Sequence, residues 1–504
     1  MSRTLSRRGL LKRGAAAAGA GLVAQGAPLL GQAPAVITAR RFRGWVTRGN
    51  GPGRTTLQEL TLRPITGRQV VVRTEASNLC YSNVPFVLAL PAGAGRGTGP
   101  GGAGAPPGGA GGPGAAGRAG GGPGPGATAP GAAGPGGGRA GGAPAAGRAG
   151  GGRGGFGGPP RAIIQGHGGV GVVEAVGPEV RRVQVGDRVC VSGTPQCGSC
   201  YQCVRGRADA CQFLADNGNL VPIAEMADGT AVVVNSHIGG LAEMMVTTEE
   251  WVVPIFTKAA PADLGMVLSC VSVAGLGAAT GPTLAPVQPG STVAVVGCGP
   301  LGLSAVVGAR IAGASTIIAI EPIRVRRELA GKLGATHLLD PNVEGDRLVA
   351  RVRELSRLPN DRYWAGGRMS GGLLGGAGAD FVIEAVGADH VPPKLEAGPD
   401  PTGLVPMRQA YEMTAPGGHL ITTSLPRGNF SVSAGLFSIG GRTQHAGQAG
   451  GTQPLRDIPK FVDYLDRGLF DAKALATRVT GLKDMLDAYE EVAYRTTVTA
   501  ILVP

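Results

Sequence analysis

The sequence predicts an α/β fold in which a β-rich part precedes a doubly wound parallel sheet. Three observations support this prediction. Apolar strands alternate with helices from residue 291 onward, a glycine-rich turn joins the first of these strands to the first helix, and short strands are expected in the preceding part. Strands interleaved with helices are typical of a parallel sheet. With 504 residues, the chain is long enough for two or more domains.

The expected elements follow from apolar periodicity and from the turns that separate them. In the first part, strands are expected at residues 69–76, 170–176 and 188–192, with a turn at 185–187. In the second part, strands are expected at 293–296, 316–320, 381–384 and 418–423, and helices at 301–312 and 326–333.

The net charge of +13 comes mainly from two segments without acidic residues. Residues 1–35 contain five Lys and Arg, and residues 92–161 contain six Arg. The rest of the chain is close to neutral, which argues against a nucleic-acid partner. Residues 147–158 are similar to arginine–glycine RNA-binding segments, but one Phe and scattered Arg offer little surface for stacking or phosphate contacts.

The N-terminal residues have the pattern of a twin-arginine export signal. Arg7 and Arg8 stand in a basic run, small apolar residues follow at 15–30, and Ala-Pro-Ala at 33–35 fits a cleavage site. A basic, frayed tail is the alternative interpretation. We expect export to the periplasm or the cell exterior, and a cytoplasmic location if the signal is not used. No other segment has about 18 consecutive apolar residues, so no membrane span is expected.

Two glycine-rich stretches interrupt the chain. The longer one, 91–160, lacks a strict triplet period, which argues against a collagen-like helix. It has few side chains that could offset the entropy of ordering, so we expect a disordered insertion. A second stretch, 366–378, is expected to be a surface insertion. A non-catalytic protein that binds a partner through the Arg/Gly tract is one alternative function.

Four cysteines lie within 15 residues: Cys197, Cys200, Cys203 and Cys211. Four thiolates complete a tetrahedral zinc site and leave no open position, so such a site stabilises structure and takes no part in catalysis. A pair of disulfides and an iron–sulfur cluster are alternatives. Cys-x2-Cys spacing suits a metal and strains a disulfide loop, so this segment is predicted to bind a structural zinc ion.

The glycine-rich turn is the second motif, and its key residues are Gly297, Gly299, Pro300, Leu301 and Gly302. It follows a strand, opens a helix, and precedes Glu321 by 19 residues. This context is typical of a dinucleotide-binding fingerprint, with the pyrophosphate at the helix N-terminus. An ordinary glycine turn is the alternative.

The charges near the end of the following strand bear on the choice of cofactor. Glu321 can accept hydrogen bonds from the adenosine ribose and would repel a 2′-phosphate, which favours NAD. Arg324, Arg326 and Arg327 keep NADP as an alternative, and Arg326 is a further cofactor-binding candidate.

A third group is dispersed along the chain. Cys80, His167 and Cys270 offer two thiolates and one imidazole, which leave a fourth zinc position open, as in catalytic sites. Taken singly, each cysteine fits a buried apolar thiol, and the histidine fits a hydrogen-bonded loop residue. Spacing alone does not bring these three together.

Several stretches, in order, resemble the medium-chain zinc-dependent alcohol dehydrogenases. The matching stretches are V-V-R-T-E-A-S-N-L-C ending at Cys80, G-H-G-G-V-G-V-V-E-A-V-G from Gly166, V-Q-V-G-D-R-V around Asp187, the four-cysteine segment, L-S-C-V-S-V-A-G-L-G around Cys270, G-C-G-P-L-G-L from Gly297, and Y-R-T-T-V from Tyr494. The resemblance extends from about residue 40 to the C-terminus, apart from the two glycine-rich stretches.

The resemblance implies a GroES-like, β-rich catalytic domain and a Rossmann cofactor domain. With the signal at 1–35, the catalytic domain is expected at 36–270 and contains the insertion. The cofactor domain is then expected at 271–449, and residues 450–504 return to the catalytic domain.

The resemblance also implies roles for individual residues. Cys80, His167 and Cys270 would bind a catalytic zinc ion, Ser82 would take the substrate proton, and Arg495 would meet the cofactor pyrophosphate. The implied reaction is hydride transfer between a small alcohol or aldehyde and NAD, in a homodimer or homotetramer.

Three positions depart from the family pattern. Gly168 stands where a glutamate is usual, Asn83 where an aspartate braces the zinc-bound histidine, and Pro85 where several members have a proton-relay histidine. These changes leave open a quinone-reductase-like enzyme without a competent catalytic zinc. Because an exported enzyme lacks a dependable pool of free NAD, we also hypothesise that NAD stays bound and is reoxidised in place.

Overall fold

The computed structural model describes residues 40–49, 53–89, 162–214, 221–235, 238–356, 378–432, 434 and 440–504. The predicted export signal, the predicted insertion at 91–160 and all but the last residue of the stretch 366–378 lie outside the described residues. All described residues belong to one compact unit.

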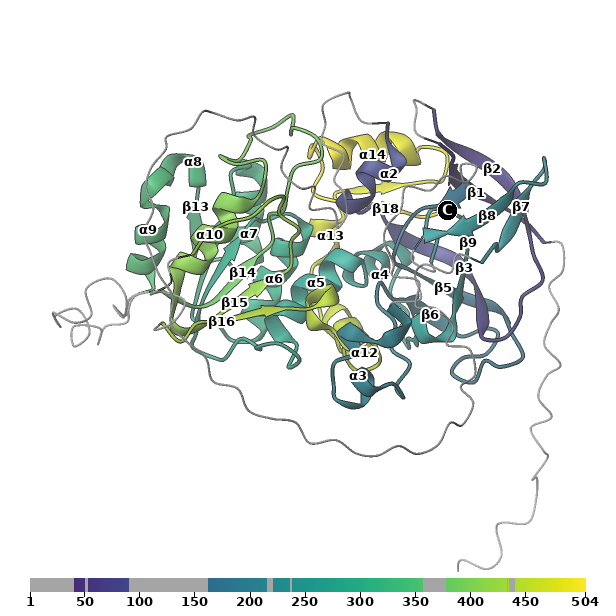
Figure 1. The fold of residues 1–504 in the computed structure, drawn as a ribbon, viewed down its shortest axis with the longest axis horizontal. Coiled ribbons are helices and arrows are strands. Elements are labelled where there is room, and N and C mark those ends of the chain that lie inside the picture. The colour runs from purple at the N-terminus through teal and green to yellow at the C-terminus, as the bar shows by residue number, and fades with distance from the viewer. Residues whose placement is uncertain are drawn as a thin grey trace, which may run out of the picture. The chain divides into compact units, whose positions relative to one another are not determined.

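The first lobe contains a closed barrel, shown in Figure 1. Its strands, in barrel order, are β1 (Arg41–Thr47), β2 (Thr55–Leu62), β7 (Ala224–Met226), β8 (Ala231–Val234) and β4 (Ala162–Ile164). β1 and β2 pair antiparallel along their whole length, whereas β4 and β8 run parallel. Apolar side chains such as Leu60 and Ile164 point inward and are fully buried.

A second sheet adjoins the barrel in this lobe. Its strand order is β10 (Val252–Pro254), β6 (Arg188–Val191), β5 (Gly169–Val176), β3 (Gln69–Asn78), β18 (Ala500–Leu502) and β17 (Arg478–Thr480), and β9 (Met244–Thr248) also pairs with β3. The pairing of β18 with β3 joins the last residues of the chain to the strand that leads to Cys80. β3, the strand that leads to Cys80, is therefore paired on both sides within the sheet.

The second lobe is a six-stranded sheet in which every neighbouring pair is parallel. Its order is β13 (His337–Leu339), β12 (Thr316–Ile320), β11 (Thr292–Val296), β14 (Ala379–Glu384), β15 (Thr414–Thr422) and β16 (Thr443–Ala446). Along β11, Val293 and Val295 face one core and Ala294 and Val296 face another. This alternation places helices on both faces and confirms the predicted doubly wound sheet.

The helices that complete the fold are short to medium in length. They are α2 (Val84–Val87), α3 (Tyr201–Val204), α4 (Pro261–Val267), α5 (Cys270–Thr280), α6 (Pro300–Ile311), α7 (Arg324–Leu333), α8 (Pro341–Glu344), α9 (Leu348–Leu355), α10 (Leu404–Met413), α12 (Pro454–Asp466), α13 (Ala472–Leu475) and α14 (Met485–Ala493). α5, α6 and α7 pack on one face of the parallel sheet, and α9 and α10 on the other (Figure 1).

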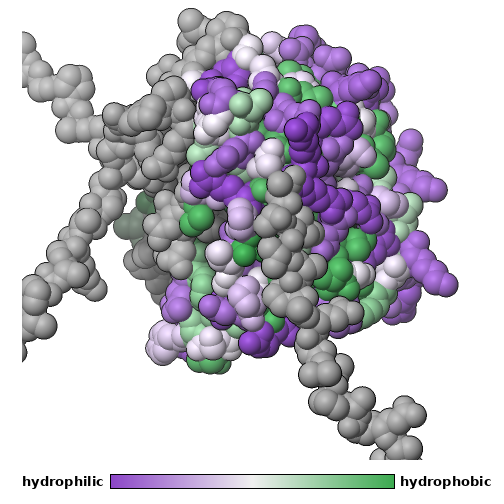
Figure 2. All heavy atoms as spheres, turned by 90° about the vertical axis from the view of Figure 1, so that its right-hand side faces the viewer, coloured by the Kyte–Doolittle hydropathy of each residue, from purple (hydrophilic) through white to green (hydrophobic). Residues whose placement is uncertain are grey.

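Two features concern possible contacts with a membrane or a partner: the length of the apolar helices and the exposed apolar side chains. Among the described residues, no single helix is long and apolar enough to cross a membrane; α4 and α5 reach that length only together and are bent by 50° relative to each other. On the face drawn in Figure 2, hydrophobic side chains outside the grey atoms occur in small groups between polar ones. Scattered exposed apolar residues of this kind are usual at protein surfaces.

Candidate active site

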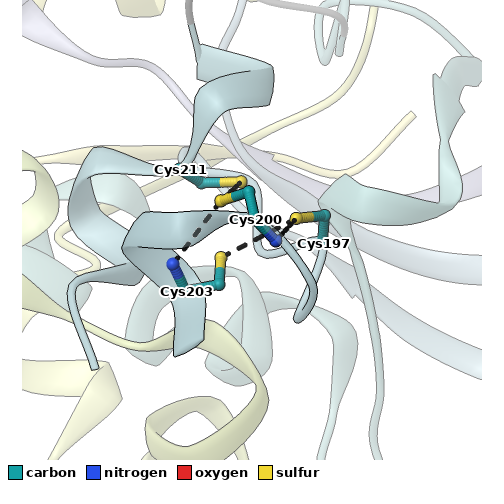
Figure 3. A group of neighbouring side chains, drawn as sticks. All are labelled: Cys197, Cys200, Cys203 and Cys211. Carbon is teal, nitrogen blue, oxygen red and sulfur yellow. Dashed lines mark hydrogen bonds between the residues drawn. The ribbon is translucent and has the colours of Figure 1, made fainter. Parts of the chain in front are cut away.

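The four cysteines of the predicted structural zinc site converge in one loop. Cys197, Cys200, Cys203 and Cys211 point their sulfur atoms toward a common centre (Figure 3). The Sγ atoms of Cys197 and Cys203 are 3.9 Å apart, and those of Cys200 and Cys211 are 4.0 Å apart. A disulfide needs about 2.05 Å, whereas zinc–sulfur bonds of about 2.3 Å in a tetrahedron give about 3.8 Å. The donor set and its spacing fit zinc.

Backbone N–H groups surround these sulfur atoms. The amides of Ser199 and Cys200 donate to Cys197 Sγ at 3.5 and 3.2 Å, and the amide of Cys203 donates to Cys200 Sγ at 3.5 Å. Burial raises the pKa of Cys200, but N–H donors from Gln212 and Cys203 lower it to about 6. Such donors stabilise thiolates, which are the form that binds a metal.

The cysteine loop is fastened to the segment that returns from the parallel sheet. Gln453 Nε2 donates to the Gly206 carbonyl at 2.5 Å, and the Leu455 amide donates to Gln196 Oε1 at 2.9 Å. Leu455 lies in the first turn of α12, which packs against α4 and α5 in the core. The loop therefore connects the lobe that contains it to the start of α12.

The predicted catalytic ligands come from three separate elements and meet at one place. Cys80 follows β3, His167 lies in the turn between β4 and β5, and Cys270 is the first residue of α5. Their ligand atoms all lie within 4.8 Å of one another. The turn before His167 depends on Gly166, which has φ of 101° and would place a Cβ 2.8 Å from the Gly240 amide nitrogen. Two sulfurs and one imidazole at this spacing fit a zinc ion with an open position.

The three ligands share protons with one another, since the pKa of Cys80 is lowered whereas the pKa values of His167 and Cys270 are raised. The hydrogen bond from Cys270 lowers the pKa of Cys80 well below its ordinary value, against the opposing effect of burial, and the charge on His167 adds to this. Burial lowers the pKa of His167, but the Cys80 thiolate raises it above its ordinary value. A divalent cation bound here would release the protons of His167 and Cys270, because imidazole and thiol groups bind a metal in their deprotonated form.

Ser82 lies beside this group, in the 3-10 turn η1 (Tyr81–Asn83). Its Oγ is 3.1 Å from Cys80 Sγ and 3.4 Å from His167 Nε2. A hydroxyl here is within reach of an atom that occupies the open position, as a proton-transfer group must be.

The three departures from the family pattern lie close to this group. Asn83 is buried, and its Nδ2 has no hydrogen-bond partner within the described part of the chain. A Cβ at Gly168 would lie 3.5 Å from Asn78 Oδ1 and 3.6 Å from the Cys270 amide nitrogen. The Pro85 carbonyl accepts from Arg54 Nη2 at 2.5 Å at the start of α2.

The predicted dinucleotide fingerprint has the expected strand–turn–helix geometry. Gly297 has φ of 88°, and a Cβ on Gly302 would lie 1.8 Å from the Gly297 carbonyl oxygen. No other residue type fits Gly302 without moving the turn. Pro300 is the first residue of α6, Leu301 is the second, and Gly299 caps the helix. The turn thus leaves the N-terminus of α6 free of side chains that would block a phosphate.

Glu321 follows β12 at the edge of this turn and is almost completely buried. Its Oε2 accepts from the Cys298 amide at 2.6 Å, and its Oε1 accepts from the Ile323 amide at 3.0 Å. The carboxylate is therefore fixed against the fingerprint, with lone pairs left for further donors.

Two arginines predicted to contact the cofactor lie on the other side of the turn. Arg326 donates to the Thr497 carbonyl at 3.0 Å, and its Nη1 lies 3.9 Å from the position of a Cβ on Gly299. Its Nε is buried without a partner in the described residues. Arg495 adopts φ of 60°, which non-glycine residues rarely do, and pairs with Asp389. The Arg326 guanidinium thus borders the fingerprint turn, whereas Arg495 contacts Tyr81 and Asp389.

Residues 389–398, between β14 and α10, form a bridging segment that the sequence did not indicate. At one end, the His390 amide donates to Tyr81 Oη at 2.8 Å, and Tyr81 Oη also accepts from Arg495 Nη2 at 3.0 Å. At the other end, Asn342 Nδ2 donates to the Ala397 carbonyl at 3.0 Å.

Further contacts fix this bridging segment on both sides. Lys394 donates its amide to the Tyr494 carbonyl, and Val391 is buried in the core of the β-rich lobe. The Arg324 amide, three residues after Glu321, donates to Glu396 Oε1 at 3.4 Å. The segment thus reaches from the Tyr81–Arg495 pair to the first residue of α7, next to Glu321.

Two family models match this chain. Residues 148–257 match the alcohol dehydrogenase GroES-like domain, and residues 300–398 match the zinc-binding dehydrogenase model. The first match includes His167 and the four-cysteine loop, and the second begins at Pro300 of the fingerprint.

Two curated relatives match over most of their length. Geraniol dehydrogenase of Castellaniella defragrans is 33% identical over 318 residues, which are 61% of this chain and 74% of that protein. The NDMA-dependent alcohol dehydrogenase of Amycolatopsis methanolica is 28% identical over 332 residues, which are 64% of this chain and 78% of that protein.

Solved structures share the fold. An alcohol dehydrogenase zinc-binding domain protein from Burkholderia ambifaria superposes with a TM-score of 0.64 at 22% identity, covering 92% of this chain and 100% of that one. Benzyl alcohol dehydrogenase from Acinetobacter calcoaceticus gives a TM-score of 0.63 at 21% identity, with 92% and 99% covered. These likenesses support the arrangement of a GroES-like lobe and a Rossmann lobe.

Proposed function

Because the chain belongs to the medium-chain zinc-dependent alcohol dehydrogenase family, we propose that Cys80, His167 and Cys270 form the catalytic zinc site of an NAD-dependent enzyme that oxidises small alcohols to aldehydes. The chain is an oxidoreductase of alcohol dehydrogenase type that acts on CH–OH donors. The relatives do not favour the two alternatives, a zinc-poor quinone-reductase-like enzyme and a non-catalytic binding protein.

The convergence of two sulfurs, one imidazole and the Ser82 hydroxyl is the observation that carries this proposal. A zinc ion held by Cys80, His167 and Cys270 would supply a Lewis acid to the alcohol oxygen. A second zinc ion, held by Cys197, Cys200, Cys203 and Cys211, would have no open position and would stabilise the loop.

The chain's own residues orient the reactants and move the proton. Ser82, held beside Cys80 and His167, accepts the proton of the alcohol hydroxyl on its Oγ while its own hydroxyl proton passes outward toward solvent. The fingerprint turn and the N-terminus of α6 bind a pyrophosphate, with Arg326 and Arg495 nearby to balance its charge. NAD would supply the hydride acceptor. With Pro85 in place of a relay histidine, the proton leaves Ser82 by another route.

Replacing Ser82 with alanine is expected to lower kcat for alcohol oxidation by about 10²- to 10⁴-fold, because a positioned proton-transfer group contributes about this much. Steady-state rates of NADH formation with a primary alcohol measure the effect. Ser82→Thr keeps a hydroxyl and is the matched control, with at least a tenth of the wild-type rate expected. Full activity of Ser82→Ala would contradict a role of Ser82 in proton transfer.

We infer that the enzyme prefers NAD to NADP. The Glu321 carboxylate is fixed by two backbone amides at the end of β12, where it would repel a 2′-phosphate. Arg326, which would favour NADP if it met a 2′-phosphate, instead donates to the Thr497 carbonyl and lies near Gly299. The ratio of kcat/KM for the two cofactors measures this preference.

We also propose that NAD stays bound between turnovers and is reoxidised in place by a second substrate. The bridging segment supports this, because its two ends contact residues at opposite ends of the proposed cofactor site. One end is tied to Tyr81 and Arg495, and the other to Arg324 and Asn342. We propose that this segment covers the bound cofactor, so that its release precedes the departure of the cofactor.

The double substitution Asn342→Ala/Glu396→Ala is expected to speed nucleotide release about thirtyfold, because it removes two hydrogen bonds worth about 1 kcal/mol each. Dilution of nucleotide-loaded protein, followed by the loss of bound nucleotide over time, measures this rate. Arg351→Ala, which removes the exposed pair with Glu354 in the same lobe, is the control. Purification of the wild-type protein without bound nucleotide would contradict the proposal that NAD stays bound between turnovers.

Export and assembly remain proposals from the sequence and the family. We propose export by the twin-arginine route to the periplasm or the cell exterior, on the strength of the motif at Arg7 and Arg8. Transport of an already folded chain would be consistent with loading of zinc and NAD beforehand. We also propose a homodimer or homotetramer.

A further inference from the structure

The surroundings of Cys270 differ from what the family pattern leads one to expect. The two positions where carboxylates are usual hold Gly168 and Asn83, and no carboxylate of the described residues belongs to the group of three ligands. A buried thiolate needs hydrogen bonds or positive charge around it. A hydrogen-bond donor to the Cys270 sulfur would meet this need.

Asn78 supplies that support. It is the last residue of β3 and is only 3% exposed. Its Nδ2 donates to Cys270 Sγ at 3.5 Å, which is within the range of an N–H···S hydrogen bond. The Asn78 backbone pairs with Ile501 of β18, so the side chain projects from a strand that is held on both sides.

Gly168 provides the room for this contact. A Cβ at this position would lie 3.5 Å from Asn78 Oδ1 and 4.0 Å from Cys270 Cβ, which are ordinary van der Waals contacts. A longer side chain would start from contacts with both residues. Gly168 therefore borders both Asn78 and Cys270.

We propose that Asn78 is a positioning residue for the catalytic zinc ion, and that its amide holds the Cys270 thiolate by a hydrogen bond beside Gly168. This inference rests on the proposed zinc site at Cys80, His167 and Cys270. A neutral N–H donor fixes the sulfur lone pairs and withdraws charge from them. The metal then receives less negative charge from the Cys270 sulfur than it would from a sulfur without this donor.

Asn78→Ala tests the proposal through zinc binding and not through activity alone. It is expected to weaken zinc binding at the three-ligand site by about 10- to 100-fold, as loss of a supporting residue commonly does. Competition with a chelator, read by native mass spectrometry, gives the affinity. In the cobalt-substituted protein, the sulfur-to-cobalt charge-transfer band is expected to shift, because the sulfur loses its donor.

Two further variants test whether the effect depends on the amide donor of Asn78. Asn78→Asp preserves the size of the side chain but replaces the donor with an anion, so it is expected to weaken zinc binding more than Asn78→Ala does. Ser77→Ala removes the neighbouring bond to the Gly240 carbonyl, at 2.6 Å, and is expected to leave the cobalt band unchanged. Zinc retained by the four-cysteine loop shows that each variant is folded.

The pairing of Gly168 with Asn78 adds a coupling test. Gly168→Glu alone is expected to lower zinc affinity, and adding Asn78→Gly to it is expected to lower the affinity by less than Asn78→Ala does in the wild type, because both changes act on one contact. An unchanged cobalt band and zinc affinity in Asn78→Ala, with two zinc ions in the wild type, would overturn this inference alone. One zinc ion in the wild type would overturn the proposed function as well.

Discussion

Cys270→Ala is expected to abolish alcohol oxidation, with kcat lowered at least about 10³-fold. The substitution removes one of the three groups that would hold the catalytic zinc ion, and a Lewis acid at the substrate oxygen stabilises the transition state by several kcal/mol. The fold should persist, because alanine suits the first turn of α5 and Ser269 still caps this helix. Steady-state kinetics and the zinc content, expected to fall from two ions to one, measure the effect.

Cys190→Ala is the matched control for this variant. Cys190 is a free, fully buried cysteine of β6 that belongs to neither group of metal ligands. Its loss should cost some stability by leaving a small cavity, while activity and both zinc ions remain. Substantial activity in Cys270→Ala, or loss of zinc from Cys190→Ala, would contradict the proposed ligand set.

Cys203→Ala is expected to lower the melting temperature by about 10 °C, with kcat at 25 °C kept within about threefold. Three sulfur ligands are left, so the loop loses its closed zinc site and the folding free energy that the metal contributes. Because Gln453 and Leu455 tie this loop to the start of α12, its loosening should spread to that contact. Calorimetry at fixed zinc concentration measures the shift.

The contrast between Cys203→Ala and Cys270→Ala distinguishes the two sites. Ser199→Ala, in the same loop but without a ligand sulfur, should leave the melting temperature unchanged within about 2 °C. An unchanged melting temperature in Cys203→Ala would contradict a structural role for the four-cysteine loop. A large loss of kcat in folded Cys203→Ala would contradict the assignment of the catalytic zinc ion to Cys80, His167 and Cys270.

Local patterns in the sequence predicted the features that depend on neighbouring residues. The strands of the parallel sheet, the fingerprint turn and the four-cysteine loop each lie within a short run of residues, so periodicity and spacing reveal them. Boundaries moved where tertiary pairing extends an element. For example, β15 begins at Thr414 and not at 418, because Thr414 pairs with Ala379 across a register shift.

Contacts between distant segments could not be read from spacing. The resemblance alone indicated that Cys80, His167 and Cys270 belong together, because they lie on separate elements and spacing does not join them. Asn78 was missed because it acts on a residue 192 positions away and looks like any polar residue at the end of a strand. Tyr81 and the bridging segment were missed for the same reason, since their function lies in contacts across the two lobes.

Native mass spectrometry of the intact protein, purified without chelator, tests the proposed catalytic centre most directly. It weighs bound zinc and nucleotide on the same molecule. Two zinc ions per chain are expected in the wild type, one at the four-cysteine loop and one at Cys80, His167 and Cys270, together with one NAD. A single zinc ion, retained in Cys270→Ala and lost in Cys203→Ala, would show that the three-ligand group does not hold a metal.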